Sequence, residues 1–218
     1  MSSLPPEGAL YALRTAGRAQ MNEQFQKLLE RAEQLIGRIE SILPQPLAAP
    51  ADWNASIAWR YRRRSSGHGV LEPVRHVAAM ALDSLKEIDV QKEKIERNTR
   101  QFVEGKPANN VLLTGARGTG KSSLIRACLQ TYAPQGLRLI EVDKAELTDL
   151  PDIVEVVSQR PEKFIVFSDD LSFDEGEPGY KALKSILDGS IAASTPNVLI
   201  YATSNRRHLL PEYMKDNL

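Results

Sequence analysis

Hydrophobic and polar positions near the start of the chain repeat with a helical period. Over residues 16–43 the apolar side chains are spaced by alternating fours and threes, which is the a and d pattern of a heptad repeat. The pattern predicts an amphipathic helix whose apolar stripe comprises Met21, Phe25, Leu28, Ala32, Leu35, Ile39 and Ile42. Leu29, Ile36 and Leu43 widen this stripe on one flank, which favours packing on a broad surface.

This predicted helix has two interpretations. It can pack on its own domain or in a small bundle, which we favour, or it can associate with a second copy or a protein partner. Pro44, Pro46 and Pro50 follow it and predict a stiff linker, because proline ends a helix. We therefore expect a helical segment and proline-rich linker over residues 1–52, and a second domain over residues 53–218.

The stretch WNASIAWRYRRR, residues 53–64, interleaves aromatic residues with arginines. Such a mixture can stack on bases and hold backbone phosphates, so a nucleic-acid partner is compatible with it. We favour a solvated basic face whose aromatic side chains pack on the core. The whole chain supports this choice, because 28 Lys and Arg balance 28 Asp and Glu and nothing else in the sequence indicates nucleic acid.

Helical and strand patterns alternate over the rest of the chain. Residues 76–104 have helical character, and Gly105 and Pro107 end this pattern. Short apolar runs that are typical of buried strands occupy residues 110–114, 137–142, 164–168 and 197–202. Helical patterns separate them at residues 121–132, after Pro151 and at residues 180–187. The alternation predicts an α/β fold with a parallel sheet covered by helices on both faces, in three layers.

Composition limits the class of protein. With 218 residues and 42% hydrophobic content, the chain can form one substantial core of a soluble globular protein. Cys128 is the single cysteine, so an internal disulfide is excluded. The N-terminus lacks a secretory apolar region, and no apolar run approaches the roughly 18 residues of a membrane span. We therefore expect a cytoplasmic protein with no membrane partner.

Residues 115–123 read GARGTGKSS and match the phosphate-loop motif G-x-x-x-x-G-K-[ST], between a predicted strand and a predicted helix. Glycines let backbone N–H groups converge on phosphate oxygens, and the helix N-terminus adds its positive end. We expect Lys121 to neutralise the β- and γ-phosphates of a bound nucleotide and Ser122 to bind Mg²⁺. The predicted phosphate-binding residues are Gly115, Ala116, Arg117, Gly118, Thr119, Gly120, Lys121, Ser122 and Ser123.

Polar residues end two of the later predicted strands. Asp169 and Asp170 follow the apolar run FIVFS, where a Walker B element is expected, so we assign Asp169 to Mg²⁺ and Asp170 to activation of a water molecule. Asn205 ends the last strand and would position that water or the γ-phosphate. The alternatives are that the two aspartates cap a helix and that Asn205 is a turn residue. We expect Lys121, Asp170 and Asn205 to be catalytic.

With these motifs in this order, residues from about 60 onward resemble an AAA+ ATPase module. The segments GVLEPVRH, IDVQKEKIERNTRQFVEGKPANNVLLTGARGTGKSSL, LRLIEVDK, FIVFSDDLSF and NVLIYATSNRRHLLPEY are similar to an uncharacterised bacterial AAA+ family known only as a domain of unknown function. The resemblance implies a P-loop NTPase fold with strand order 5-1-4-3-2, ATP as ligand, and assembly in which an arginine finger comes from a neighbouring subunit.

Three departures from the AAA+ pattern modify this expectation. Asp170 stands where AAA+ proteins usually have Glu, and its side chain is one methylene shorter. The narrower family that the chain resembles also uses Asp-Asp at these positions. The segment DKAEL, residues 143–147, lacks the aromatic residue of polypeptide-threading enzymes, which disfavours threading. The chain ends at Leu218, before the fifth strand, the arginine finger and the lid, so we expect the phosphate-loop strand at a sheet edge and only weak ATPase activity.

Three functions remain open from the sequence. The first is an ATPase that couples Mg-ATP binding and hydrolysis to conformational change in a partner or assembly. The second is a nucleotide-gated binding or scaffold module with little or no hydrolysis, which recruits partners through the N-terminal helix. The third is a P-loop kinase that phosphorylates a small molecule, which we favour least because the polar ends of the strands suit water as the acceptor.

Overall fold

A computed structural model of the chain describes residues 24–39, 47–50, 52–65, 67–174, 177–187 and 195–206. The chain divides into two compact units, Met1–Gln45 and Pro46–Leu218. In the first unit, residues 24–39 form an α-helix, and the rest of the helix predicted over residues 16–43 lies outside the described residues. In the described part of the chain, no helix combines the length and the apolar character needed to cross a membrane.

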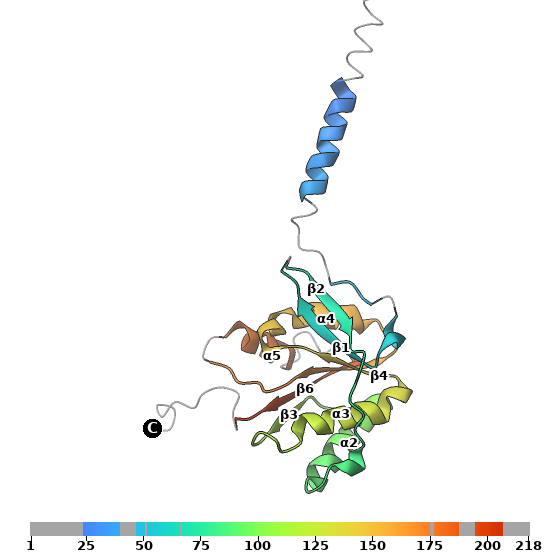
Figure 1. Ribbon diagram of the computed structural model, residues 1–218, viewed down its shortest axis with the longest axis vertical. Coiled ribbons are helices and arrows are strands. Elements are labelled where there is room, and N and C mark those ends of the chain that lie inside the picture. The colour runs from blue at the N-terminus through green and yellow to red at the C-terminus, as the bar shows by residue number, and fades with distance from the viewer. Residues whose placement is uncertain are drawn as a thin grey trace, which may run out of the picture. The chain divides into compact units, whose positions relative to one another are not determined.

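The second unit contains a six-stranded sheet with the order β2-β1-β4-β5-β6-β3 (Figure 1). All strands run parallel except β2, which pairs antiparallel with β1. Within the described residues, the phosphate-loop strand β3 lies at one edge of the sheet, as expected. The strands are β1 (Ala58–Arg63), β2 (Gly69–Pro73), β3 (Val111–Thr114), β4 (Leu137–Glu141), β5 (Lys163–Ser168) and β6 (Val198–Ser204).

Helices cover both faces of this sheet, with α2 and α3 on one face and α4 and α5 on the other (Figure 1). The α-helices of this unit are α2 (Asp89–Val103), α3 (Lys121–Tyr132), α4 (Leu150–Ser158) and α5 (Pro178–Leu187). Short 3₁₀ helices are η1 (Trp53–Ala55), η2 (Leu82–Ser84), η3 (Ala133–Gln135) and η4 (Lys144–Asp149). The predicted three-layer α/β architecture is therefore confirmed.

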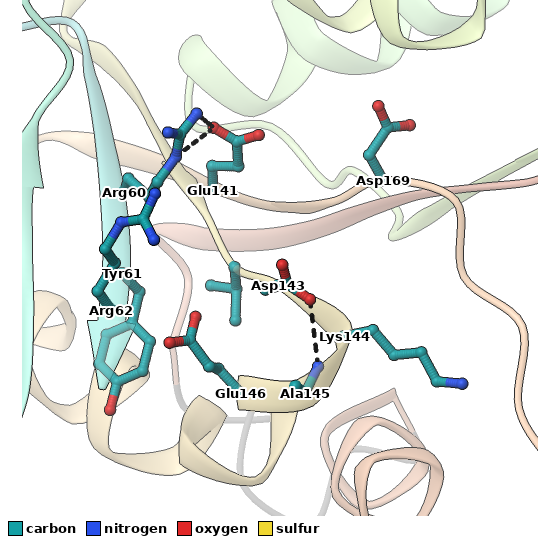
Figure 2. A pocket seen from close by; sticks show the side chains of 10 residues that line it. Arg60, Tyr61, Arg62, Glu141, Asp143, Lys144, Ala145, Glu146 and Asp169 are labelled. Atoms are coloured by element: carbon teal, nitrogen blue, oxygen red, sulfur yellow. Dashed lines mark hydrogen bonds and ion pairs between the residues drawn. The ribbon is translucent and has the colours of Figure 1, made fainter. Parts of the chain in front are cut away.

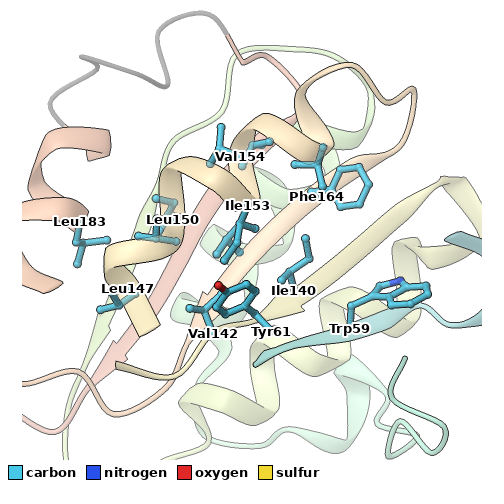
Figure 3. Packing of buried hydrophobic residues seen from close by; sticks show 14 of the residues in the cluster. Trp59, Tyr61, Ile140, Val142, Leu147, Leu150, Ile153, Val154, Phe164 and Leu183 are labelled. Atoms are coloured by element: carbon cyan, nitrogen blue, oxygen red, sulfur yellow. The ribbon is translucent and has the colours of Figure 1, made fainter. Parts of the chain in front are cut away.

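Two apolar cores lie on the two faces of the sheet, and β5 contributes to both. Phe164 and Val166 pack into the core beneath α4, whereas Ile165 and Phe167 pack into the core beneath α3. This division follows from strand geometry, because successive side chains point to opposite faces. Figure 3 shows the first core, in which Leu147, Leu150 and Ile153 from η4 and α4 cover the sheet. Packing in both cores fixes the carboxyl end of β5, which is followed by Asp169 and Asp170.

The helix predicted over residues 76–104 is wrong in its first half. Only α2 is a regular α-helix there, and the preceding segment contains η2 and otherwise irregular backbone. Glu87 has a φ of 63°, in the left-handed region, which is incompatible with a continuous helix. Val74, Val77, Leu82, Leu85 and Ile88 pack against the core beneath α3, so their apolar character reflects burial of a connecting segment.

Residues 53–64 form η1 and β1, an assignment that the basic and aromatic composition did not suggest. Trp53, Trp59 and Tyr61 are buried in the core beneath α4, and the arginines face outward. Tyr61 donates a hydrogen bond of 2.7 Å to Asp149. Burial is the larger cause, and this hydrogen bond the second, of a pKa of the phenol that is raised above its ordinary value. The hairpin of β1 and β2 extends the sheet beyond β4 and adds an antiparallel edge to the predicted parallel sheet.

Candidate functional site

The loop between β3 and α3 has the shape of a phosphate cradle. Gly118 and Gly120 both have a φ of 83°, in the left-handed region that favours glycine. Gly120 precedes the first turn of α3 and provides no capping side chain, so the N–H groups of that turn face the loop. Thr119 Oγ1 donates to the carbonyl of Ala116 at 2.9 Å and closes the loop on itself. The arrangement presents backbone donors and the positive end of α3 to one point.

Lys121 crosses the mouth of this loop. Its Nζ donates to the carbonyl oxygens of Gly115 and Ala116, at 2.7 and 2.8 Å, and to Oδ1 of Asn205 at 3.1 Å. The ammonium group is therefore held between the loop and the end of β6. Because an ammonium group binds phosphate as a point charge, this position suits the predicted role of Lys121.

The two aspartates at the end of β5 meet the loop and β6. Ser122 Oγ donates to Oδ1 of Asp169 at 2.6 Å, and Nδ2 of Asn205 donates to Oδ1 of Asp170 at 2.5 Å. Asp170 has a φ of 55°, in the left-handed region, so the chain turns sharply after Asp169. The structure thus brings together the predicted residues from three separate segments of the chain.

A pocket of about 300 Å³ lies between these groups. It is lined by Arg117, Gly118, Gly120, Lys121, Ser122, Ser123, Asp169, Asp170, Thr203 and Asn205. Of the predicted loop residues, Gly115 and Ala116 turn their carbonyl oxygens to Lys121, and Thr119 bonds within the loop. These three shape the loop while the other predicted residues line the pocket.

Thr203 is the site residue that sequence reasoning missed. Its hydroxyl donates to Oδ1 of Asp169 and accepts the backbone N–H of Asp170 at 2.9 Å. The side chain is buried, at 1% exposure. A hydroxyl two positions before Asn205 was the available signal, since alternate residues of a strand share a face.

The donor groups fit a magnesium nucleotide. The hydroxyl of Ser122 and the carboxylate of Asp169 offer the oxygen ligands that Mg²⁺ prefers. No cluster of three or more His, Cys, Asp or Glu that could hold a metal occurs within the described residues. A metal bound here would therefore take ligands from a phosphate and water as well, which is the usual coordination of Mg²⁺.

A second, larger cavity of about 480 Å³ shares Asp169 with this pocket (Figure 2). Figure 2 shows Arg60 and Arg62 of β1 along one side of it. Arg60 is held by Oε2 of Glu141, at 3.1 Å from Nε and 2.8 Å from Nη2. These hydrogen bonds, and then the charge of Glu141, raise the pKa of Arg60.

The other arginines of this stretch also lie beside carboxylates. Arg63 pairs with Asp149, and Arg62 and Arg64 pair with Glu72, at 3.9 and 3.3 Å. The positive charge of residues 53–64 is therefore offset locally by carboxylates on β2, β4 and η4. This pairing favours the interpretation of a solvated face whose aromatic side chains belong to the core.

Strand order, loop and site together define a P-loop protein of the AAA+ class. The neighbours β3, β6, β5 and β4 reproduce the 1-4-3-2 part of the AAA+ sheet, with the phosphate loop after β3 and the Asp-Asp pair after β5. The family described as a protein of unknown function, DUF815, matches residues 54–218. Because this match covers most of the sequence, the chain belongs to that family.

Comparison with curated proteins gave no match. Solved structures that are similar to the chain include DnaI, with 22% identity over 61% of this chain and 73% of that chain and a TM-score of 0.44. AMPPCP-bound DnaA from Aquifex aeolicus has 16% identity over 58% of this chain and 42% of that chain, with a TM-score of 0.42. A RuvB variant from Thermotoga maritima has 16% identity over 62% of this chain and 45% of that chain, with a TM-score of 0.45. The chain thus spans less than half the length of the DnaA and RuvB structures.

Proposed function

We propose that this chain binds Mg-ATP in the pocket between the phosphate loop and the ends of β5 and β6, and hydrolyses it to change the conformation of a partner or an assembly. The observation that carries the proposal is the convergence of Lys121, Ser122, Asp169, Asp170 and Asn205 around one pocket. These residues come from segments far apart in the sequence, and each carries a group that ATP hydrolysis requires.

In this proposal the loop and Lys121 bind the phosphates, and Ser122 and Asp169 hold the metal. Bound Mg²⁺ would neutralise negative charge on the phosphates as the transferred group leaves. Asp170 accepts the proton of the attacking water, and Asn205 orients that water through its amide. The hydrogen bonds of Asn205 with both Lys121 and Asp170 support these assigned roles. Through them one side chain connects the lysine that would bind phosphate to the aspartate that would act as the base.

A second function is favoured by the helix of residues 24–39. Within this helix Phe25, Leu28 and Leu35 are exposed, at 60%, 67% and 52%. Exposed apolar side chains in a row are typical of an interaction surface. The alternative is therefore a nucleotide-gated scaffold, in which ATP binding controls partner recruitment and hydrolysis is slow or absent.

Nucleotide binding is tested first, by titrating the purified chain with a fluorescent ATP analogue and Mg²⁺ while phosphate release is followed. We expect saturable binding that Lys121→Ala weakens at least tenfold, because the pocket loses the ammonium group that lies between the loop and the end of β6. Lys181→Ala is the matched control, since this lysine is exposed on α5 and lies outside the pocket.

The outcomes separate the functions. Binding with phosphate release that both depend on Lys121 supports the ATPase. Binding without release supports the scaffold. Equal binding by the wild type and Lys121→Ala would contradict a nucleotide site in this loop.

A further inference from the structure

One buried hydroxyl lies between the two aspartates of the site. Thr203 Oγ1 donates its proton to Oδ1 of Asp169 and accepts the N–H of Asp170 at 2.9 Å. A hydroxyl has one proton to donate and lone pairs to accept, so both of these bonds can form at once. With 1% of the residue exposed, water has little access to replace either bond.

The end of β6 also fixes the residue that follows the aspartates. The carbonyl of Thr203 accepts the N–H of Leu171 at 2.7 Å, and Ser204 Oγ donates to the carbonyl of Leu171 at 2.6 Å. Asp170, with its left-handed φ of 55°, directly precedes these bonds at Leu171, and its own N–H is bonded to Thr203. The direction in which each carboxylate leaves the chain is therefore set by contacts with β6.

We propose that Thr203 is a positioning residue, whose hydroxyl orients Asp169 toward the metal and holds the backbone of Asp170 so that its carboxylate meets Asn205. This inference rests on the proposed function. The hydroxyl bonds to Oδ1 of Asp169 and to the backbone N–H of Asp170, so it would act through the two aspartates. Residues that hydrogen-bond to a metal ligand in this way fix its orientation and tune its affinity for the metal.

Ser122 explains why the hydroxyl of Thr203 would matter most once Mg²⁺ is present. Oδ1 of Asp169 accepts hydrogen bonds from both Ser122 and Thr203. If the hydroxyl of Ser122 bound a metal, Thr203 would be the donor that still holds Asp169. The phosphate contacts of the loop and Lys121 do not depend on Thr203. We therefore expect Thr203 to affect binding that requires Mg²⁺ and to leave Mg²⁺-free nucleotide binding unchanged.

The test is Thr203→Val, which removes the hydroxyl and keeps the branched shape of the side chain. Mg²⁺ is titrated into the full chain with a fluorescent ATP analogue, and the same analogue is titrated in EDTA. We expect the Mg²⁺ concentration at half-saturation to rise about 10- to 100-fold, as is typical when a residue that supports a metal ligand is lost. Affinity in EDTA should stay within about twofold of the wild type, and Thr203→Ser should restore the Mg²⁺ requirement.

Two controls separate positioning from general destabilisation. Thr99→Val removes another fully buried hydroxyl, which contacts the carbonyl of Ile95 and the hydroxyl of Tyr201 away from the pocket. It should leave the Mg²⁺ requirement unchanged, and the thermal midpoint of each variant reports its stability. If Thr203→Val does not fold, Thr203→Ala takes its place with the same expected result.

Three results would overturn the inference. They are a folded Thr203→Val with the wild-type Mg²⁺ requirement, an equal loss of affinity in EDTA, and a defect that Thr203→Ser does not restore. A wild-type chain that binds no nucleotide would overturn the proposed function as well, and this result is seen before any variant is made.

Discussion

At the scale of single residues, Asn205 connects Lys121 of the phosphate loop to Asp170 at the end of β5. Its amide oxygen accepts from Lys121 and its amide nitrogen donates to Asp170. An amide suits this position because it offers a donor and an acceptor at once, whereas a carboxylate would only accept. Any displacement of Lys121 by a bound phosphate therefore reaches Asp170 through one side chain.

Asp170→Asn tests the assignment of the base. The change keeps the size of the side chain but removes the carboxylate that would accept a proton, so we expect turnover to fall about 10²- to 10⁴-fold. Nucleotide affinity should be kept, because Lys121, Ser122 and the loop are unchanged. Single-turnover phosphate release and the binding titration measure the two quantities separately.

Asp169→Asn is the informative comparison for this variant. Asp169 is assigned to the metal, so its replacement should raise the Mg²⁺ requirement, which Asp170→Asn should leave alone. Undiminished turnover in Asp170→Asn would mean that another group activates the water, or that hydrolysis is not the function of the pocket.

At the scale of secondary-structure elements, the hairpin of β1 and β2 depends on close packing at Gly69. A Cβ atom added there would approach Cε2 of Tyr61 to 2.7 Å, well inside van der Waals contact. Tyr61 is itself fixed by burial and by its hydrogen bond to Asp149. Gly69→Ala should therefore destabilise the protein by about 1–3 kcal/mol, the usual cost of overpacking.

Urea denaturation of Gly69→Ala measures this cost. His68→Ala, at the preceding position of the same hairpin, is the control, and we expect it to change the free energy of unfolding by less than about 0.5 kcal/mol. A Gly69→Ala variant as stable as the wild type would show that the hairpin can shift away from Tyr61.

The elements differ in how far the sequence predicts them, and the reasons are physical. β5 and β6 are buried on both faces and therefore appear as continuous apolar runs, and α3 begins at the lysine of the phosphate motif. In β1 the buried residues alternate with arginines, which is the period of two of a strand. The basic and aromatic composition of this stretch was interpreted instead of its period, so the strand was not predicted. Thr203 was missed because its hydroxyl near the end of β6 does not by itself indicate a partner, and the hydrogen bonds to Asp169 and Asp170 come from a neighbouring strand.

At the scale of the whole molecule, the parallel strands end on the side of the sheet where both cavities lie. The phosphate loop, the two aspartates and Asn205 all follow the carboxyl ends of strands, which is where ligands bind in open α/β sheets. The hairpin brings Arg60 and Arg62 to the same edge, and their cavity shares Asp169 with the pocket beside the phosphate loop. Asp169 is thus part of the lining of both cavities.

The first unit, treated by itself, leads to the last prediction. The helix of residues 24–39 exposes Leu28 and Leu35 on its apolar stripe, at 67% and 52%. A single helix of this length is only marginally stable in water, so something must cover the stripe. Burying each leucine contributes about 1.5–3 kcal/mol, and a second copy presents the same stripe. We therefore expect the full chain to self-associate, and Leu28→Glu to weaken association at least tenfold without changing nucleotide affinity.

Sedimentation velocity over a range of protein concentrations measures this association. Gln34→Glu adds the same charge outside the predicted stripe and should leave association unchanged. If the wild type stays monomeric and Leu28→Glu lowers the thermal midpoint instead, the stripe packs on the chain's own second unit. The two interpretations of the heptad pattern are then separated by one substitution, because only covering by another chain depends on concentration.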